Sequence, residues 1–235
     1  MSASLGLPVG GDSRSGSVAE SLRDILDAAA RGVFPAADGG TTVVPQPSVR
    51  DAGVLAFTAH SVVFTDEDPA WVRRALAGVD CDVLAASMNA RFLAAFMKRT
   101  GRRTDTIDVM AVAAPLVDVP SLGLEEIGDA GHPRVVSARG RRDDVRVWVA
   151  EGGGGVVVLG RGVAGRLEVA VEVAEGARCR GVGRRLALAA RGLAGRLAGG
   201  EAVWAQVSPG NARSLRAFQA AGYRVVGAEA LLLPG

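Results

Sequence analysis

Arginines and glycines gather in one short segment, Arg178–Gly183, whose residue types and spacing suit the binding of an anion. The segment follows an apolar strand pattern and precedes a helix pattern rich in alanine and leucine. Glycines at such a junction let the backbone turn tightly and leave free amide N–H groups at the positive end of the helix. With guanidinium groups beside them, these amides predict an anion cradle, and a diphosphate is the anion that we expect.

The elements around this segment must hold it in place. Apolar residues alternate with other residues in Val145–Val149, Val156–Leu159 and Leu167–Val173, and glycine-rich turns separate the three stretches. This pattern predicts three antiparallel strands that lead into the glycine loop. A helix over Gly183–Leu197 and a strand over Ala202–Val207 are expected to follow.

A second helix is expected to begin at Asn211 and to end at Gly222, and Tyr223–Val226 begins a last strand. The element order predicts a mixed sheet with helices on its faces. The last strand has little sequence after it, since the chain stops soon after Leu231–Leu233. Either one bent strand runs to the end, or a partner segment completes the sheet, which leaves a homodimer open.

Two motifs in this region resemble those of a known family. Arg178–Gly183 is similar to the (Gln/Arg)-x-x-Gly-x-(Gly/Ala) signature of the GCN5-related N-acetyltransferase (GNAT) superfamily. Asn211–Ser214, followed by Phe218 and Gly222–Tyr223, resembles the second signature of that family. The resemblance covers about residues 145–233 and implies an α/β fold of GNAT type, a mixed and mostly antiparallel sheet flanked by helices, with an extra N-terminal α/β region.

The resemblance implies acetyl-coenzyme A (acetyl-CoA) as cofactor. Its pyrophosphate would lie on the amides of Arg180–Arg184, and its pantetheine arm would pair with the backbone of Val171 and Val173, where the strand splays at a bulge. Asn211 would hydrogen-bond the pantetheine or a buried water. The expected cofactor-binding residues are Val171, Val173, Arg178, Cys179, Arg180, Gly181, Val182, Gly183, Arg184, Asn211, Ser214 and Phe218. Cys179 occupies a variable motif position, so we interpret its thiol as structural.

The implied reaction is direct attack of an acceptor amine on the thioester, for which a base must remove a proton from the ammonium. Glu168, on the strand before the loop, is our first choice, and we expect an apolar wall to raise its pKa. Glu172, on the same strand face, is the second choice. The alternative for both carboxylates is a solvated strand face.

Phe218 departs from the family pattern, because many members have a tyrosine there that acts as the general acid. Losing that acid would cost about 10–100-fold in rate, and Tyr223 is a weaker substitute. An N-acetyltransferase acting on an amine is therefore our first hypothesis, and a non-catalytic module that binds acyl-CoA is the second. A dinucleotide-binding Rossmann motif fits less well, because Leu186 stands where its third glycine belongs.

Composition excludes several other classes. The chain has 235 residues, 49% of them apolar, and a formal net charge of +2, which is too balanced for a nucleic-acid partner. Cys81 and Cys179 lie far apart, with His60 and His132 as the only histidines, so we expect neither a disulfide framework nor a metal site. No apolar run is long enough for a membrane span, and we expect a cytoplasmic protein without membrane or nucleic-acid partners.

The N-terminal half lies outside the resemblance. We divide the chain into a disordered tail over residues 1–16, an N-terminal α/β region of unknown role over 17–118, which would face the acceptor or be degenerate, and a GNAT-like acetyl-CoA-binding domain over 119–235. The pattern predicts a helix over Val18–Arg31 with a capping box at Ser17–Glu20. Gly39–Ser48 is expected to be a connector.

The rest of this half shows strand and helix signals in turn. Val54–Thr65 is rich in β-forming residues and predicts one long strand or a hairpin around Ala59–His60. Helices are expected after Asp68 and after Ser87. Ile107–Ala113 is a short apolar stretch that predicts a buried strand, and no catalytic constellation is visible in this half.

Overall fold

The computed structural model describes residues 20–117, 122–128, 131–197 and 199–235. The predicted tail over residues 1–16 and the predicted N-cap Ser17 lie outside the described residues, and so does the predicted domain boundary between 118 and 119.

The N-terminal half contains three α-helices, a 3-10 helix and five strands among its described residues. They are α1 (Leu22–Ala30), β1 (Thr41–Val44), β2 (Ala52–Phe57), β3 (His60–Phe64), α2 (Pro69–Ala77), η1 (Val83–Met88), α3 (Ala90–Thr100), β4 (Arg102–Arg103) and β5 (Ile107–Ala113).

The C-terminal half holds the predicted strands, loop and helices in the predicted order. Its elements are β6 (Leu124–Ile127), α4 (Pro133–Arg139), β7 (Asp143–Ala150), β8 (Gly155–Arg161), β9 (Leu167–Val173), α5 (Val182–Leu197), β10 (Val203–Val207), α6 (Ala212–Ala220) and β11 (Arg224–Pro234). Short 3-10 turns η2 (Glu151–Gly153), η3 (Val163–Gly165) and η4 (Glu175–Ala177) join the strands.

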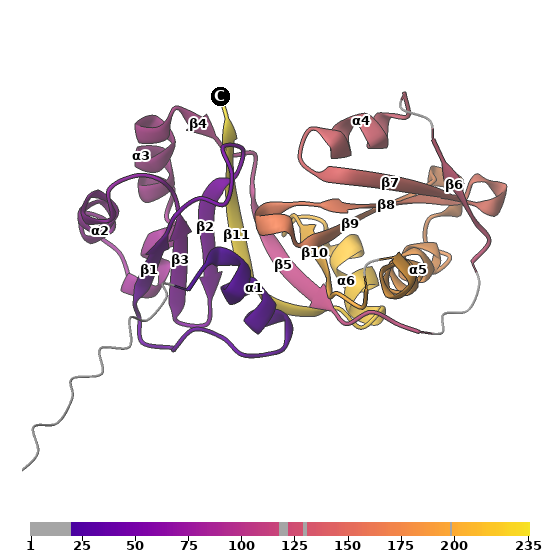
Figure 1. Cartoon of the computed structure of the whole chain (residues 1–235), viewed down its shortest axis with the longest axis horizontal. Helices are drawn as coiled ribbons and strands as arrows, with labels where there is room; N and C mark the ends of the chain where they lie inside the picture. Colours follow the sequence, from indigo (N-terminus) through magenta and orange to yellow (C-terminus); the bar gives the residue numbers. More distant parts are fainter. Residues whose placement is uncertain (1–19, 118–121, 129–130, 198) are drawn as a thin grey trace, which may run out of the picture.

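One sheet runs through both halves in the order β1-β3-β2-β11-β5-β10-β9-β8-β7-β6. Strand β5, from the N-terminal half, lies between β10 and β11 of the C-terminal half and is antiparallel to both. Figure 1 shows β5 and β11 between the N-terminal and the C-terminal elements. The two halves therefore share a sheet, and neither has a complete one without the other.

The last strand resolves the choice that the sequence left open. Strand β11 is one long strand with a bulge between Val225 and Gly227, and it pairs with β2 on one side and β5 on the other. The segment that completes the sheet thus belongs to the same chain, and a homodimer stays a prediction.

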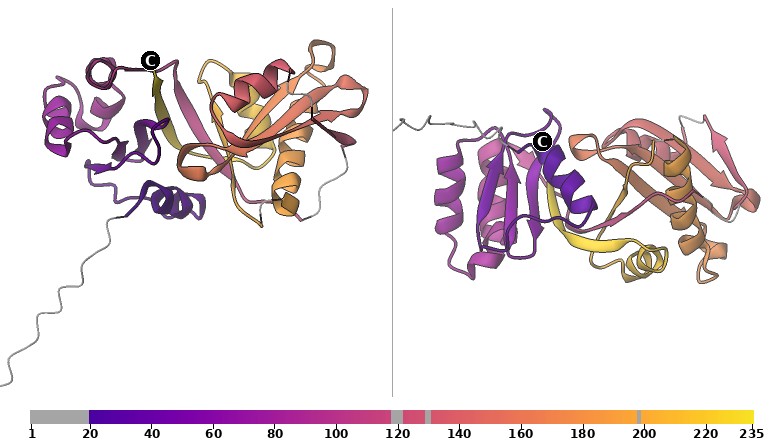
Figure 2. Two further views of the ribbon diagram at one scale, coloured as in Figure 1. Left: turned by 45° about the horizontal axis from the view of Figure 1, so that its top comes forward. Right: turned by 60° about the horizontal axis from the view of Figure 1, so that its bottom comes forward.

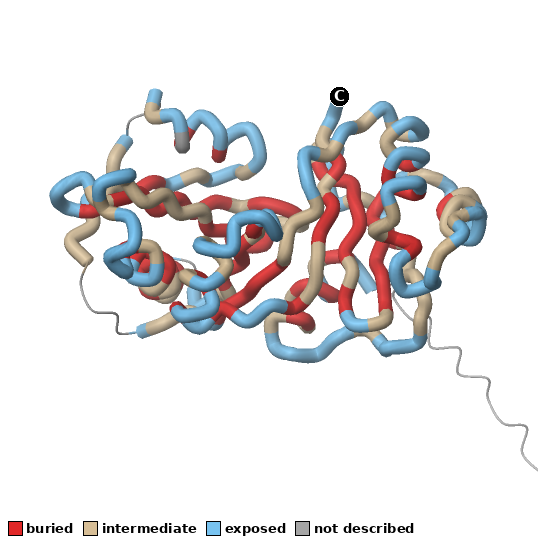
Figure 3. Tube along the Cα trace, turned by 180° about the vertical axis from the view of Figure 1, so that it is seen from behind, coloured by how far each residue is buried: buried red, intermediate tan, exposed pale blue. Residues whose placement is uncertain are grey.

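Helices cover both faces of the sheet (Figure 2). Helix α5 packs Leu186 and Ala190 against Val157 and Val169, and α6 adds Phe218 to this core. Helix α1 buries its apolar side against the opposite face, together with β2, β5 and β10. Buried segments follow the strands, as Figure 3 shows, while much of the helix surface is exposed. This is the predicted mixed fold, largely antiparallel and flanked by helices.

The parallel pair β9 and β10 separates after two residues. Leu167 pairs with Val203 and Glu168 with Trp204, and no later pairing joins the two strands. Because Val169–Val173 turns away from Ala205–Val207, the sheet opens into a V at the ends that face the glycine loop. The predicted splay of the strand before the loop is thus observed, and it leaves backbone groups of β9 free of β10. The predicted bulge is not observed, because β9 pairs with β8 in an unbroken register from Leu167 to Val173.

Three local predictions for the N-terminal half are wrong. Helix α1 begins at Leu22, after the capping box of Ser21 and Asp24, and not at Val18. Asn89 caps α3 in place of Ser87, which lies in η1. The expected connector contains strand β1. This strand pairs with β3, which lies about twenty residues further along the chain, so no turn next to β1 in the sequence indicates it.

We expect Val112→Asp to destabilise the whole molecule. Val112 is buried in β5 among apolar residues, and its cross-strand neighbour Arg224 already donates to the carbonyls of Ala29 and Ala30. A carboxylate buried there should therefore cost more than about 3 kcal/mol. Urea unfolding followed by tryptophan fluorescence measures this cost. The exposed Val83 gives the control, Val83→Asp, with a change within about 0.5 kcal/mol. A Val112→Asp protein whose C-terminal half unfolds at the normal urea concentration would contradict the shared-sheet argument.

Candidate functional site

A groove of about 680 Å³ opens at the V, between β9 and the starts of α5 and α6. Ten of the residues predicted to bind the cofactor line it: Val171, Val173, Arg178, Cys179, Gly181, Val182, Gly183, Arg184, Asn211 and Ser214. Arg180 and Phe218, also predicted, do not line it. Glu172, the second candidate base, lies at its edge.

The glycine loop presents free amides to this groove. Cys179 and Gly181 adopt left-handed backbone conformations, with φ of 61° and 74°, which turn the chain sharply into α5. The first helical bond runs from the amide of Arg185 to the carbonyl of Gly181, at 3.2 Å. The amides at the start of α5, up to that of Arg184, therefore have no intrahelical partner and are available to an anion.

Close packing explains the second glycine of the loop. A Cβ atom on Gly183 would lie 3.4 Å from Cβ of Ala217 and 3.5 Å from Cγ2 of Val173. A Cβ atom alone would make ordinary van der Waals contacts there, so the further atoms of a larger side chain would press on α6 and β9 or extend into the groove. Gly183 thus keeps the floor of the groove open where three elements meet.

Four arginines surround the groove. Arg178 and Arg184 come from the loop, and the Arg184 Nε donates to the carbonyl of Ala220 at 3.0 Å. Arg213 and Arg216 come from α6 and were not among the predicted binding residues. They are three positions apart and hence on one helix face, a spacing that could have indicated them.

Asn211 caps the N-terminus of α6, whether or not it also contacts a ligand. Its Oδ1 accepts a hydrogen bond from the amide of Ser214 at 3.1 Å and so caps α6. This bond fixes the side chain at the rim of the groove and leaves its amide NH₂ group as the part that can reach a ligand.

Phe218 and Tyr223 form a buried pair away from the groove. Their rings meet edge to face, with centroids 4.9 Å apart. The Tyr223 hydroxyl donates to the carbonyl of Ala187 at 3.4 Å, and burial raises the pKa of this phenol far above its usual range. Neither side chain can donate a proton into the groove, so Tyr223 does not replace the missing tyrosine.

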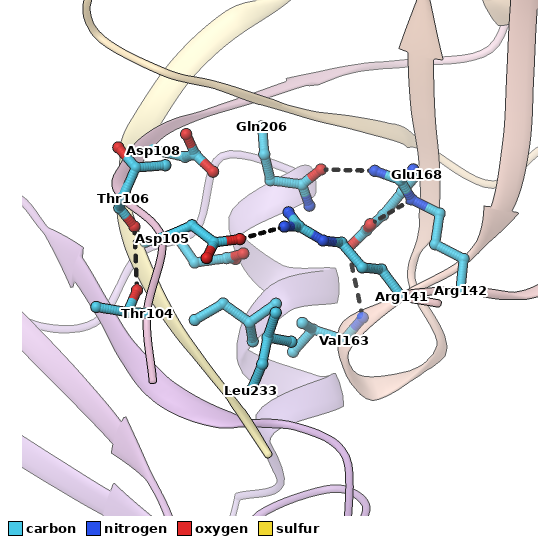
Figure 4. Close-up of a pocket in the computed structure, with 12 residues that line it drawn as sticks. Thr104, Asp105, Thr106, Asp108, Arg141, Arg142, Val163, Glu168, Gln206 and Leu233 are labelled. Carbon is cyan, nitrogen blue, oxygen red and sulfur yellow. Dashed lines mark hydrogen bonds and ion pairs between the residues drawn. The ribbon is translucent and has the colours of Figure 1, made fainter. Parts of the chain in front are cut away.

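A second, smaller cavity of about 120 Å³ lies at the V and draws on both halves of the chain (Figure 4). Its lining residues are Thr104, Asp105, Thr106, Asp108, Arg141, Arg142, Val163, Glu168, Gln206, Glu229, Leu231 and Leu233. Along β9, Leu167 and Val169 pack toward α5, whereas Glu168 points to the other face of the sheet. The two cavities thus approach the V from different sides.

Glu168 lies in this second cavity and is held by two arginines. Its Oε2 accepts from Nε of Arg142 at 2.7 Å, and its Oε1 accepts from Nε of Arg166 at 2.9 Å. Burial raises the pKa of this carboxyl, but the two guanidiniums outweigh burial and hold its pKa below the usual range. The expected raised pKa is therefore wrong, because the predicted apolar wall is a pair of cations.

Arg166 is the centre of the buried charges. It is 2% exposed, stands 5.3 Å from the Trp204 ring centroid, and pairs with Glu168 and, at 2.6 Å, with Glu229. Burial raises the pKa of Glu229, and Arg166 opposes this only in part. Each of these three charges loses its hydration on burial, and the ion pairs of Arg166 with the two carboxylates compensate for part of that loss.

Asp105 and Asp108 line the same cavity, but they differ in their ion pairs and in their burial. Asp105 pairs with Arg141 and, at 3.2 Å, with Arg103. Asp108 is half-buried in β5 and lies directly opposite Glu229 of β11. Burial raises the pKa of Asp108, the charge of Arg141 opposes this in part, and neighbouring Asp105 raises the pKa further. The sequence carried a signal for Asp108 that we did not use, namely a lone carboxylate in the apolar strand Ile107–Ala113.

Among the described residues, no group of histidine, cysteine, aspartate or glutamate side chains could hold a metal ion. Within the same residues, no helix combines the length and apolar character needed to cross a membrane.

Comparison with known proteins finds a family match in the C-terminal half. Residues 125–223 match the model of the acetyltransferase (GNAT) family. A search of curated protein sequences finds no match.

Solved structures give further similarities. A GCN5-related N-acetyltransferase from Kribbella flavida is 17% identical, with a TM-score of 0.45, over 81% of this chain and 90% of the other. An acetyltransferase of the same family from Novosphingobium aromaticivorans is 20% identical, with a TM-score of 0.40, over 57% and 68% of the two chains. A tandem GNAT protein from the clavulanic acid biosynthesis pathway is 15% identical, with a TM-score of 0.38, over 61% and 58%.

We expect Glu168→Gln to destabilise the protein by about 3–5 kcal/mol at neutral pH, because it leaves buried Arg166 without one of its carboxylates. The lowered pKa of Glu168 means that its stabilisation is present above the unfolded-state pKa and is lost as pH falls through the folded-state pKa. The difference between wild type and variant should therefore shrink in acid.

Urea unfolding from pH 7 down to pH 3 measures that difference. Glu126→Gln is the matched control, because Glu126 pairs with Arg146 on the surface and such pairs contribute about 0–1 kcal/mol. Equal losses for the two variants would show that Glu168 is not an essential partner of Arg166.

Proposed function

Because residues 125–223 match the model of the acetyltransferase (GNAT) family, we propose that this protein transfers an acetyl group from acetyl-CoA to an amine of an acceptor. The observation that carries the proposal is the groove at the V, where unpaired amides at the start of α5 meet a ring of arginines. This arrangement suits a diphosphate beside an extended chain.

The residues of the groove fit the donor part by part. The amides that precede Arg185 and the guanidiniums of Arg178 and Arg184 would hold the pyrophosphate, with the dipole of α5 adding to the attraction. The backbone of Val171 and Val173 has no partner in β10 and would pair with the amide groups of pantetheine. Bound acetyl-CoA would supply a thioester that points into the V.

The reaction that we propose is direct attack of the amine on this thioester. Glu168 and Glu172 were predicted from the sequence as bases, and both stay predictions. An ionised carboxylate held by Arg142 and Arg166 is a weak proton acceptor, however, so the contacts of Glu168 favour a role in positioning. Glu172 is among the residues that line the groove itself.

The second candidate function is a module that binds acyl-CoA without turnover. The observation in its favour is the buried pair of Phe218 and Tyr223, which supplies no proton donor to the groove. Coenzyme A is a good leaving group, so the missing acid weakens the enzyme hypothesis without removing it.

Thiol release separates the two functions. Acetyl-CoA is incubated with the protein and a panel of primary amines, and free coenzyme A thiol is followed with a thiol reagent, next to calorimetry of coenzyme A binding. Amine-dependent thiol release supports the acetyltransferase. Tight coenzyme A binding without thiol release for any amine would support the binding module instead.

We expect Gly183→Val to weaken coenzyme A binding by at least about tenfold, since a branched side chain there meets Ala217 and Val173 and fills the groove. Gly128→Val is the matched control, because Gly128 is exposed and has open space around the position of a Cβ atom. Calorimetry measures the binding, and circular dichroism checks that both variants fold. Unchanged affinity in Gly183→Val would show that the donor binds elsewhere.

A further inference from the structure

The smaller cavity lies where an acceptor would have to approach the donor. Glu168 is the last residue of β9 that pairs with β10, and Gln206 follows on β10 where the two strands have parted. Both side chains line this cavity, whereas Val171 and Val173 line the donor groove. The cavity thus reaches, from the sheet face opposite α5, the place where β9 and β10 part. A donor bound in the groove would leave this face open to an acceptor.

The charged groups of this cavity are nearly all neutralised by one another. Arg142 bonds Glu168 and reaches Oε1 of Gln206 at 3.4 Å. Arg141 pairs with Asp105 at the more exposed rim. These contacts leave the cavity without a free cation among its described residues.

Asp108 is the exception. No hydrogen bond or ion pair among the described residues ends on its carboxylate, and none is drawn to it in Figure 4. Its cross-strand neighbour is Glu229, whose Oε2 is buried and has Arg166 as its only ionic partner in the described part of the chain. Two adjacent carboxylates, one of them without a partner, give the cavity a local excess of negative charge that favours a cation.

We propose that Asp108 is a catalytic residue, which binds the ammonium group of a primary-amine acceptor and takes the proton that its nitrogen must lose before attack. This inference rests on the proposed acetyltransferase function. Asp108 belongs to β5, so the N-terminal half, outside the matched residues 125–223, would supply the acceptor side of the site.

The proton balance of this step is complete. The ammonium gives one proton to Asp108, which passes it to water, and the nitrogen lone pair forms the new bond to the thioester carbonyl carbon. The carbon–sulfur bond breaks, its electron pair leaves with sulfur, and the second nitrogen proton ends on the thiol. The products are an N-substituted acetamide, coenzyme A thiol and one released proton.

The cavity also limits the acceptor. Its volume of about 120 Å³ and its walls of Leu231, Leu233 and Val163 suit an amine on a narrow apolar stem. We therefore assign primary alkylamines as the acceptor class and exclude acceptors that carry a carboxylate beside the amine, because Asp108 and Glu229 would repel it.

The test compares wild type with Asp108→Asn in full-length protein. The probe amines are n-butylamine, phenethylamine and 1,4-diaminobutane, and norvaline, which carries a carboxylate beside its amine, should not react. Asp108→Asn should lower kcat/KM for the best amine by about 100-fold or more, while the coenzyme A affinity stays unchanged. Amide NMR shifts of the coenzyme A complex, titrated with n-butylamine, should report weaker binding in the variant.

Stability gives a second readout, which separates a loss of activity from a loss of folded protein. The pKa of Asp108 is raised in the fold, so its ionised form costs stability at neutral pH. Asp108→Asn should therefore melt higher than wild type at pH 7, and the gain should vanish as pH falls through the folded-state pKa. A variant that is more stable yet less active is the expected result.

The pH profile of wild-type kcat/KM should fall in acid as Asp108 becomes protonated, and Asp108→Asn should lose this limb. Other charged groups face Asp108 and could titrate: Glu229 on β11, Glu168 on β9, Asp105 before β5, and Arg141, Arg142 and Arg166 from the neighbouring loops. Asp105→Asn is thus the pocket control, with a change below about tenfold, and the exposed Asp80→Asn is the surface control.

Two failures are distinguishable. Thiol release that survives Asp108→Asn with its acid limb intact overturns the role of Asp108 and leaves the acetyltransferase function standing. Absence of thiol release with every amine, in a protein that binds coenzyme A, overturns the acetyltransferase function and with it the catalytic role of Asp108.

Discussion

The pairing of β5 between β10 and β11 is the constraint on which the rest of the structure depends. A sheet strand without neighbours leaves its amides and carbonyls unsatisfied, and the C-terminal half ends without a strand of its own to fill this place. The N-terminal half supplies it. Because β5 arrives from another part of the sequence, the side chains that it carries into the sheet, Asp108 among them, are set by the N-terminal half.

The V between β9 and β10 follows from the same arrangement. Strand β10 is held on its other edge by five register pairs with β5, so it can leave β9 after two pairs without losing its place. The backbone of β9 beyond Glu168 then faces the groove and not a neighbouring strand. Strand β9 stays in the sheet because it pairs with β8 along its whole length. Its other edge is open beyond Glu168, and the backbone groups there could pair with a ligand that carries amide groups.

Local chemistry made the C-terminal half predictable from sequence. The glycine turns, the period-two strands and the loop before α5 depend on near neighbours, and the cap at Asn211 acts over three residues. The charged cavity depends on distant pairs such as Arg142 with Glu168, and Arg166 with Glu229. Glu168 could be recognised as a polar residue on a strand, but the two cations that lower its pKa come from segments whose approach only the fold determines. The groove beside the glycine loop was therefore predictable, and the charged cavity was not.

Buried charge in this cavity is costly, which bears on what the cavity is for. Arg166, Glu168 and Glu229 give up their hydration inside the sheet, and ion pairs of this kind often contribute little net stability compared with apolar residues of similar size. The cluster does hold Arg142 and Gln206 in place beside the V, and it keeps the negative charge of Glu229 next to Asp108. A core selected for stability alone would place apolar side chains on this face, as β9 and β10 do on the face toward α5. The charges retained here, with Glu229 beside Asp108, fit the cationic acceptor that we propose.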